Sequence, residues 1–299
     1  MRRALPLVLA LATLALGSAS AASTPPTDRS IKLDLIAKLQ QSPQILILGD
    51  SRGRQAQPSF LQRLTGHNGF NAAVMGGTIP DAWVFTRYAA DRFPGQKRRY
   101  ILFVSSGLAG DIPDPRTEAD PRGRRYLQEV EPYLDRRPLK VAWPSHPFDG
   151  YRPDGSLPGR AWPPSPAHVS QVKAEAAAVV AKIRQHPPTK PQPDQARFRL
   201  FEHLLAYMNA RGERPVIVFN PLYPTVYAAL AQYGSPVTTS SLDYLRSLRA
   251  KYDFVVVDCE NIRTWGGTAY DWKNAGHVDQ ANMRRLLRYV VAHSDGALQ

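Results

Sequence analysis

Residues 45–51 read Ile-Leu-Ile-Leu-Gly-Asp-Ser, and this stretch decides the fold. Four consecutive apolar residues that end at a glycine and two polar residues indicate a short strand buried on both faces, as in a parallel sheet. Four further apolar runs of this kind follow, at 70–74, 100–104, 216–219 and 254–257. The chain therefore contains five predicted strands.

Segments with helical spacing of apolar residues separate these strands. They cover 80–93, 195–210, 224–232, 241–251 and 281–292. Strands that alternate with helices predict an α/β protein, a three-layer α/β/α arrangement around a five-stranded parallel sheet. With 299 residues and 43% hydrophobic residues, the chain is long enough to bury a large core and is unlike a disordered protein.

The segment 112–193 does not follow this pattern. It holds 16 of the 27 prolines, too many for central strands, and only 169–185 has a helical pattern. We interpret it as a long Pro-rich insertion between the third strand and the helix that leads to the fourth. An irregular surface excursion is the first interpretation, and a lid or a wall of a substrate site is the alternative.

The N-terminus has the features of a signal peptide. Arg2 and Arg3 precede a short apolar run, and Ala19 and Ala21 occupy the positions of a small-residue cleavage site. We expect residues 1–21 to be removed, so that the domain 22–299 is secreted or reaches the periplasm or cell envelope without a transmembrane anchor. The single cysteine, Cys259, ends an apolar run and is expected to be a buried hydrophobic residue.

The net charge of +13 points to anionic surroundings. Basic residues cluster at 97–99, 122–125 and 136–137, where they form either a solvated face or a site for an anionic cell-envelope polymer. Nucleic acid is not expected as a partner, because the chain has no nucleic-acid-binding motif and carries an export signal.

Two residues that are far apart in the sequence are candidate catalytic residues. Ser51 follows the first strand, at the edge where parallel sheets build their ligand sites, although Gly-Asp-Ser is also ordinary turn sequence. His277 lies in a polar loop before the last helix, near Asp271 and Asn274. A histidine that only caps the helix is the alternative interpretation.

Taken together, these motifs resemble the SGNH (GDSL-type) hydrolase superfamily. The stretch 45–51 looks like the family's first block, 71–78 (Asn-Ala-Ala-Val-Met-Gly-Gly-Thr) is similar to the second, and His277 before the final helix matches the last. The resemblance implies a flavodoxin-like fold, with Ser51 as nucleophile and His277 as its base. It also implies that the backbone N–H groups of Ser51 and Gly76 form the oxyanion hole.

The sequence departs from the family pattern at two places. The asparagine of the third block falls on Ala109, and the carboxylate three residues before the histidine falls on Asn274. Asn274 or Asp271 is therefore expected to orient His277, with Asn274 favoured by its position. If His277 acts as the base, kcat/KM is expected to rise with pH through a group whose pKa is near 6.5, modified by its surroundings.

Together with the export signal, the resemblance implies an exported serine esterase, and the single cysteine and scattered histidines predict that it needs neither a metal nor another cofactor. Its expected substrate is an ester-bearing small molecule or an acylated glycan, from which the acyl group passes to water or to a sugar hydroxyl. The alternative is an inactive SGNH-like module that binds anionic wall polymer or glycan, which Ala109 and Asn274 favour.

Overall fold

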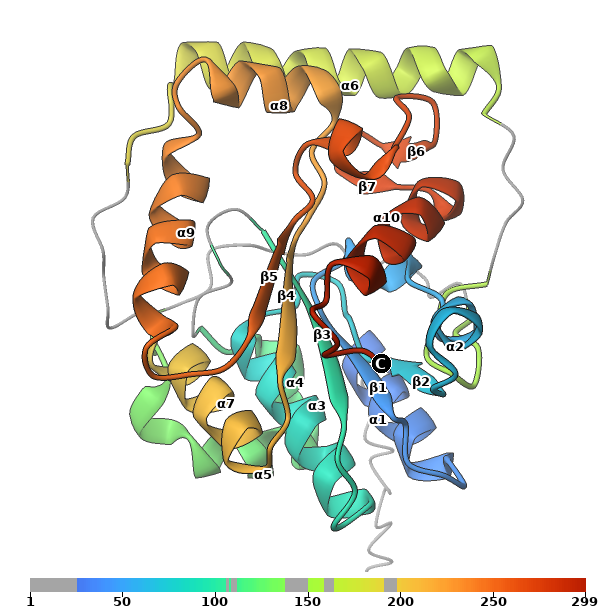
Figure 1. The fold of residues 1–299 in the computed structure, drawn as a ribbon, viewed down its shortest axis with the longest axis vertical. Helices are drawn as coiled ribbons and strands as arrows, with labels where there is room; N and C mark the ends of the chain where they lie inside the picture. Colours follow the sequence, from blue (N-terminus) through green and yellow to red (C-terminus); the bar gives the residue numbers. More distant parts are fainter. Residues whose placement is uncertain (1–25, 106–107, 109–111, 138–149, 159–163, 191–197) are drawn as a thin grey trace, which may run out of the picture.

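The computed structural model describes residues 26–105, 108, 112–137, 150–158, 164–190 and 198–299. At its centre lies a five-stranded parallel sheet with the order β2-β1-β3-β4-β5 (Figure 1). The strands are β1 Ile45–Gly49, β2 Gly69–Asn71, β3 Arg99–Val104, β4 Pro215–Phe219 and β5 Val255–Asp258. The α/β class and the five-stranded parallel sheet expected from the sequence are confirmed.

The apolar run of β1 explains why this sequence forms a central strand. Its side chains alternate between the faces of the sheet, so Leu46 and Leu48 enter one hydrophobic core and Ile45 and Ile47 enter the other. All four side chains are completely buried. A strand with both faces covered needs an apolar residue at every position.

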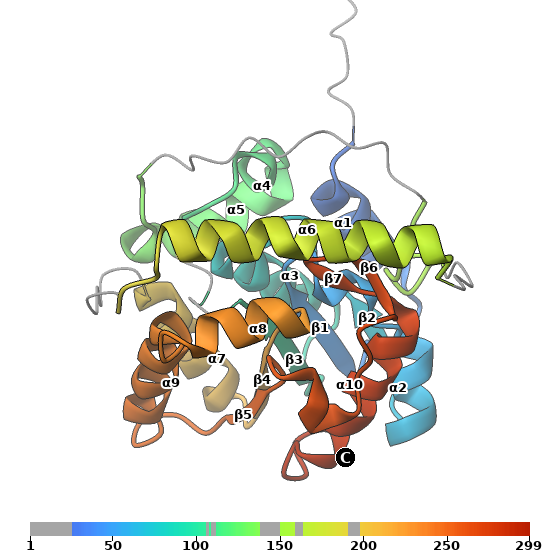
Figure 2. The ribbon, with the colours of Figure 1, turned by 90° about the horizontal axis from the view of Figure 1, so that it is seen from above.

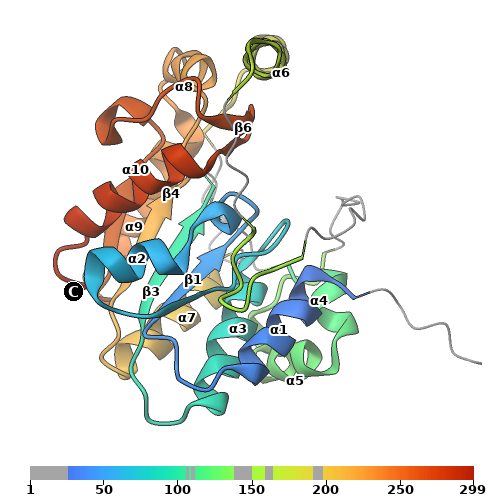
Figure 3. The same cartoon turned by 90° about the vertical axis from the view of Figure 1, so that its right-hand side faces the viewer.

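Helices cover both faces of the sheet (Figure 3). They are α1 Asp28–Lys38, α2 Pro58–Thr65, α3 Ile79–Arg92, α4 Pro115–Ala119, α5 Pro121–Glu129, α6 Pro166–Gln185, α7 Arg199–Ala210, α8 Pro224–Ala231, α9 Pro236–Leu248 and α10 Gln280–Ala292. Helices α1, α3, α5, α7 and α9 pack on one face, and α2, α6, α8 and α10 pack on the other. Helices α1 and α2 were not predicted.

Short elements complete the described structure. They are the 3₁₀ turns η1 Gly53–Gln55, η2 Glu131–Tyr133 and η4 Ile262–Trp265, and the antiparallel hairpin of β6 Trp272–Asn274 and β7 His277–Val278.

The described part of the Pro-rich segment contains regular helices and is not an irregular surface loop. Its described residues include three helices, each with a proline in its first turn, a position that favours a helix; they are α4, α5 and α6, and α6 confirms the helix predicted over 169–185. Tyr126 and Leu127 of α5 are buried in one core, and Val172 and Ala176 of α6 in the other. The first interpretation of this segment is thus wrong for its described part, although none of those residues belongs to the central sheet. Helix α6 lies above the hairpin (Figure 2).

The structure does not describe the predicted signal peptide, but it does show the environment of Cys259. The predicted leader 1–21 and the mature start at Ala22 lie outside the described residues. Within the described part of the chain, no helix is both long and apolar enough to cross a membrane. Cys259 is buried, and burial raises the pKa of its thiol well above the ordinary value.

Candidate active site

The turn after β1 brings Ser51 to the carboxyl edge of the sheet. Gly49 has a φ of 126°, and a Cβ atom there would lie 2.2 Å from the carbonyl oxygen of Phe103 on β3, so only glycine fits. The Asp50 carboxylate accepts the backbone N–H of Arg52 at 2.9 Å and shapes the turn around Ser51. Burial raises the pKa of Asp50, and the nearby Arg52 guanidinium opposes this shift.

Ser51 and His277 are 226 positions apart in sequence, and the fold brings them into contact. The hydroxyl of Ser51 lies 2.8 Å from Nε2 of His277. On the other side of the ring, Nδ1 lies 2.8 Å from Oδ1 of Asn274. The same oxygen accepts the backbone N–H of Gly276 at 3.0 Å, which fixes the orientation of the amide. Nδ1 therefore carries the proton, and Nε2 is free to accept the hydroxyl proton of Ser51.

The environment of His277 keeps its imidazole neutral. Burial lowers the pKa of His277 to about 4, and the charges of Arg52, Lys273 and Arg54 act in the same direction. This value is lower than the unperturbed value near 6.5, because a sequence shows neither how deeply the fold buries the ring nor which cations it brings near. At neutral pH the ring is thus unprotonated, as a general base must be.

Asp271 does not contact His277. Its Oδ2 accepts Nη1 of Arg285 at 2.5 Å and the hydroxyl of Thr268 at 2.9 Å, and the backbone N–H of Asp279 bonds to its carbonyl. Of the two residues considered for orienting the imidazole, Asn274 contacts the ring and Asp271 does not. Asp271 instead ties the loop before the hairpin to the last helix, α10, through Arg285.

The loop after β2 lies beside the Ser51 turn. Gly77 sits so close to Gly49 that a Cβ atom on it would lie 2.2 Å from the Gly49 carbonyl oxygen. Gly76 has a φ of 61°, in the left-handed region. Among the described residues, no hydrogen-bond acceptor contacts the backbone N–H of either Ser51 or Gly76.

The third-block positions are only partly described. Ser106 and Ala109 lie outside the described residues, whereas Ser105 is half-buried at the end of β3. Asn220 follows the end of β4, where its amide could replace the missing asparagine as a donor, but its Nδ2 donates to Oδ1 of Asp50 at 3.3 Å. Within the described part of the chain, Oδ1 of Asn220 is buried and has no partner.

Helix α1 anchors the loop that carries Gly76. The Asp28 carboxylate accepts the backbone N–H of Met75 at 2.6 Å, and Arg29 donates to the Met75 carbonyl at 3.2 Å. Arg29 is 1% exposed and forms ion pairs with Asp28, Asp81 and Asp114. The sequence did not identify Asp28 or Arg29, since they end a short polar segment, 23–29, that has no apolar pattern.

Helix α6 is hydrogen-bonded to the β6–β7 hairpin that carries His277. Glu175 accepts the backbone N–H of Ala275, two residues before His277, at 3.1 Å. Nε2 of His168 lies 2.8 Å from the carbonyl oxygen of Trp272. Neither residue has a sequence signal that relates it to the hairpin, because both contacts join segments about a hundred residues apart.

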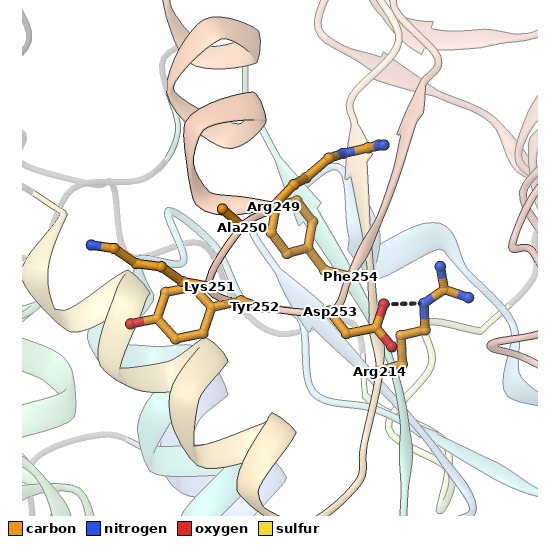
Figure 4. A pocket seen from close by; sticks show the side chains of 7 residues that line it. All are labelled: Arg214, Arg249, Ala250, Lys251, Tyr252, Asp253 and Phe254. Atoms are coloured by element: carbon orange, nitrogen blue, oxygen red, sulfur yellow. Dashed lines mark ion pairs between the residues drawn. The ribbon is translucent and has the colours of Figure 1, made fainter.

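The described residues contain no cluster of three metal-ligating side chains. A surface hollow of about 370 Å³, lined by Arg214 and residues 249–254, lies at the amino ends of β4 and β5 (Figure 4). Ser51 lies at the opposite edge of the sheet, after the carboxyl end of β1. This hollow is therefore separate from the Ser51–His277 pair.

Comparisons with known proteins give little further information. No family model and no curated protein matches the chain. One solved structure, from Streptococcus pneumonia and provisionally described as a platelet activating factor, resembles it with 14% identity over 88% of this chain and 91% of that chain. The TM-score of 0.37 is too low to support an argument about fold or function.

Proposed function

We propose that this protein is a serine esterase of the SGNH type, in which Ser51 is the nucleophile and His277 the general base. The observation that carries the proposal is the chain of two 2.8 Å contacts from Ser51 through His277 to Asn274. A nucleophile bonded to a base that is itself oriented by a third group is the arrangement that activates serine in acyl transfer.

The reaction follows from this geometry. Oγ of Ser51 attacks the ester carbonyl carbon while its proton passes to Nε2 of His277. The N–H groups of Ser51 and Gly76 stabilise the negative charge that develops on the carbonyl oxygen. The bond to the alcohol then breaks, and the imidazolium gives its proton to the leaving oxygen. Water, or a sugar hydroxyl, repeats these steps on the acyl-serine and regenerates Ser51.

The proposal also covers the location of the enzyme and its substrates. We place the enzyme outside the cytoplasm because of the N-terminal signal pattern, and we name O-acyl groups of a cell-envelope or extracellular polysaccharide as its substrates. The competing function is a glycan-binding module without turnover. A neutral amide at Asn274 favours that function, because it stabilises the imidazolium less than a carboxylate does.

Turnover of 4-nitrophenyl acetate separates the two functions. The Ser51→Ala variant should lose activity by at least about a thousandfold and should no longer form an adduct with a phosphonate inhibitor in mass spectrometry. Ser59→Ala, which changes an exposed serine on α2, is the matched control and should behave as wild type. Equal activity of the Ser51→Ala variant and the wild type would reject the esterase assignment.

A further inference from the structure

The sequence Asp-Pro-Arg occurs twice in the Pro-rich segment, at 114–116 and at 120–122. In both copies the aspartate is the N-cap of a helix, α4 or α5, and accepts the backbone N–H of the arginine two residues later. Its carboxylate also forms two hydrogen bonds with the guanidinium of that arginine. The two copies therefore share one local structure, and they differ in what else each guanidinium contacts.

The second copy joins two helices. Arg122, in the basic cluster at 122–125, lies with its Nη1 2.6 Å from Oδ1 of Asp34, and its Nη2 donates to the carbonyl oxygen of Ser30 at 3.3 Å. Both partners belong to α1, and neither belongs to a loop of the proposed site. This arginine is thus ion-paired within the fold and stabilises the packing of α5 on α1.

The first copy reaches the loop that carries Gly76. Nη2 of Arg116 donates to the carbonyl oxygen of Met75 at 3.1 Å, and Nη1 of Arg29 donates to the same oxygen at 3.2 Å. The Asp28 carboxylate accepts the N–H of Met75 at 2.6 Å. The contacts come from α1 and α4, which lie side by side (Figure 3). We refer to Asp28, Arg29 and Arg116 as the Met75 clamp.

The carbonyl oxygen of Met75 and the N–H of Gly76 belong to the same peptide group. This group is planar and trans, so its oxygen and its N–H point in opposite directions. Guanidinium groups that hold the oxygen therefore also set the direction of the N–H. Rotation of the peptide group changes the φ of Gly76, and glycine tolerates positive and negative φ alike, so the glycine by itself does not hold the observed value of 61°.

The surroundings of the Met75 clamp keep it in one arrangement. Arg29 is 1% exposed, and it donates to both carboxylate oxygens of Asp81 at 2.8 Å. Asp81 in turn accepts the backbone N–H of Thr78, two residues after Gly76, at 2.9 Å. Hydrogen bonds that involve charged groups are stronger than neutral ones, especially where water is excluded. The loop is therefore held by charged groups on both sides of Gly76.

We propose that Arg29 and Arg116 are positioning residues, which direct the N–H of Gly76 toward the oxyanion by holding the carbonyl of Met75. This inference rests on the proposed function, in which that N–H stabilises the oxyanion. The family's third-block asparagine falls on Ala109, so the proposed oxyanion hole has two backbone donors, and the direction of each matters for the rate. Helix α4 of the Pro-rich segment thereby contributes to the site without touching the substrate.

Arg116→Gln tests the proposal without removing a buried charge. The side chain of Arg116 is partly exposed, and Asp114 keeps its ion pair with Arg29 at 3.1 Å. The variant should lower kcat toward 4-nitrophenyl acetate about tenfold and leave KM within about twofold, because the oxyanion forms only after the ester is bound. Arg122→Gln is the matched control, since it breaks the same arginine–aspartate pair in the second copy. It should keep the wild-type kcat and have a Tm similar to that of Arg116→Gln.

A thiono ester separates positioning of the N–H from a general loss of structure. In 4-nitrophenyl thionoacetate a sulfur replaces the carbonyl oxygen, and sulfur is a weak hydrogen-bond acceptor. Each kcat/KM is divided by the rate constant of alkaline hydrolysis of the same ester, which removes differences in intrinsic reactivity. The wild type should prefer the oxygen ester. Arg116→Gln should reduce this preference about fivefold, whereas Arg122→Gln should retain it.

Two kinetic results would overturn the proposal. The first is a wild-type kcat in Arg116→Gln, which would show that the rate does not depend on this contact. The second is an equal loss toward both esters, because the arginine would then act on stability or on the Ser51–His277 pair and not on the oxyanion.

The direction of the Gly76 N–H can also be measured without turnover. Its residual dipolar coupling in ¹⁵N-labelled protein should change in Arg116→Gln and stay the same in Arg122→Gln. If no ester is hydrolysed but this change is found, the esterase function fails and the orientation of Gly76 by the Met75 clamp stands. If esters are hydrolysed through Ser51 while the coupling and kcat are unchanged in Arg116→Gln, only the positioning role fails.

Discussion

Replacing Asn274 by Asp tests how the neutral amide limits the base. The side chains are nearly isosteric, so a carboxylate oxygen can keep the 2.8 Å contact to Nδ1 of His277 and the 3.0 Å contact to the N–H of Gly276. The new negative charge favours the imidazolium, which forms when Ser51 gives up its proton. The substitution should therefore raise both the pKa of His277 and the rate.

The size of the effect follows from the two kinds of hydrogen bond. A neutral bond contributes about 1 kcal/mol and a bond to a charged group about 2 kcal/mol, which predicts a five- to tenfold rise in kcat/KM on the plateau. The same difference raises the pKa of His277 by about one unit. In the wild type, kcat/KM should rise with pH through a group near 4 and be level at neutral pH. In the Asn274→Asp variant, this rise should lie at higher pH.

The assay follows acetate release from 4-nitrophenyl acetate between pH 3.5 and 9 at constant ionic strength. Asn274→Ala should lower kcat/KM, because Nδ1 loses its acceptor. The matched control is Asn261→Asp, which adds a negative charge at another site where the side chain accepts a backbone N–H. A wild-type profile that rises near pH 6.5 would contradict the conclusion that burial and the charges of Arg52, Lys273 and Arg54 lower the pKa of His277. An Asn274→Ala variant as active as the wild type would show that Asn274 does not orient His277.

Three further predictions concern stability, the hairpin and processing. Arg29→Ala removes the cation that Asp28, Asp81 and Asp114 share, and only Asp114 keeps another ion pair, with Arg116 at 2.7 Å; the change should lower the free energy of unfolding by about 3–5 kcal/mol in urea titrations. Arg122→Ala, at a partly exposed ion pair, should cost about 1 kcal/mol or less, and equal losses would refute the role of burial. Glu175→Ala removes the acceptor for the N–H of Ala275 and should lower kcat about three- to tenfold with little change in Tm. Glu175→Gln keeps an acceptor oxygen and should restore most of the activity, so equal defects in both variants would exclude this positioning role. N-terminal sequencing of exported protein should begin near Ala22, and a chain that still begins at Met1 would contradict the signal-peptide assignment.

The sheet could be predicted from the sequence because each strand is a run of apolar residues whose side chains enter two cores. Helix α1 could not, since Asp28, Arg29 and Lys32 are charged and yet completely buried. Their partners lie on other segments, so the pattern along α1 looks polar. Helices α4 and α5 of the Pro-rich segment were hidden for another reason. Prolines usually signal irregular backbone, but Pro115 and Pro121 occupy first turns, where their fixed φ suits a helix.

For the site, the sequence by itself determined which residues come to the edge of the sheet. Ser51 follows the first buried strand and His277 precedes the last helix. Local patterns of apolar residues predict both this strand and this helix. Only the tertiary structure decided what surrounds them. The hairpin pairs Asn274 with His277, while Asp271 turns toward Arg285, because β-sheet register and not sequence distance sets which side chains meet. The depressed pKa of His277 likewise results from burial and from charges on two separate loops, which become neighbours only when the chain folds.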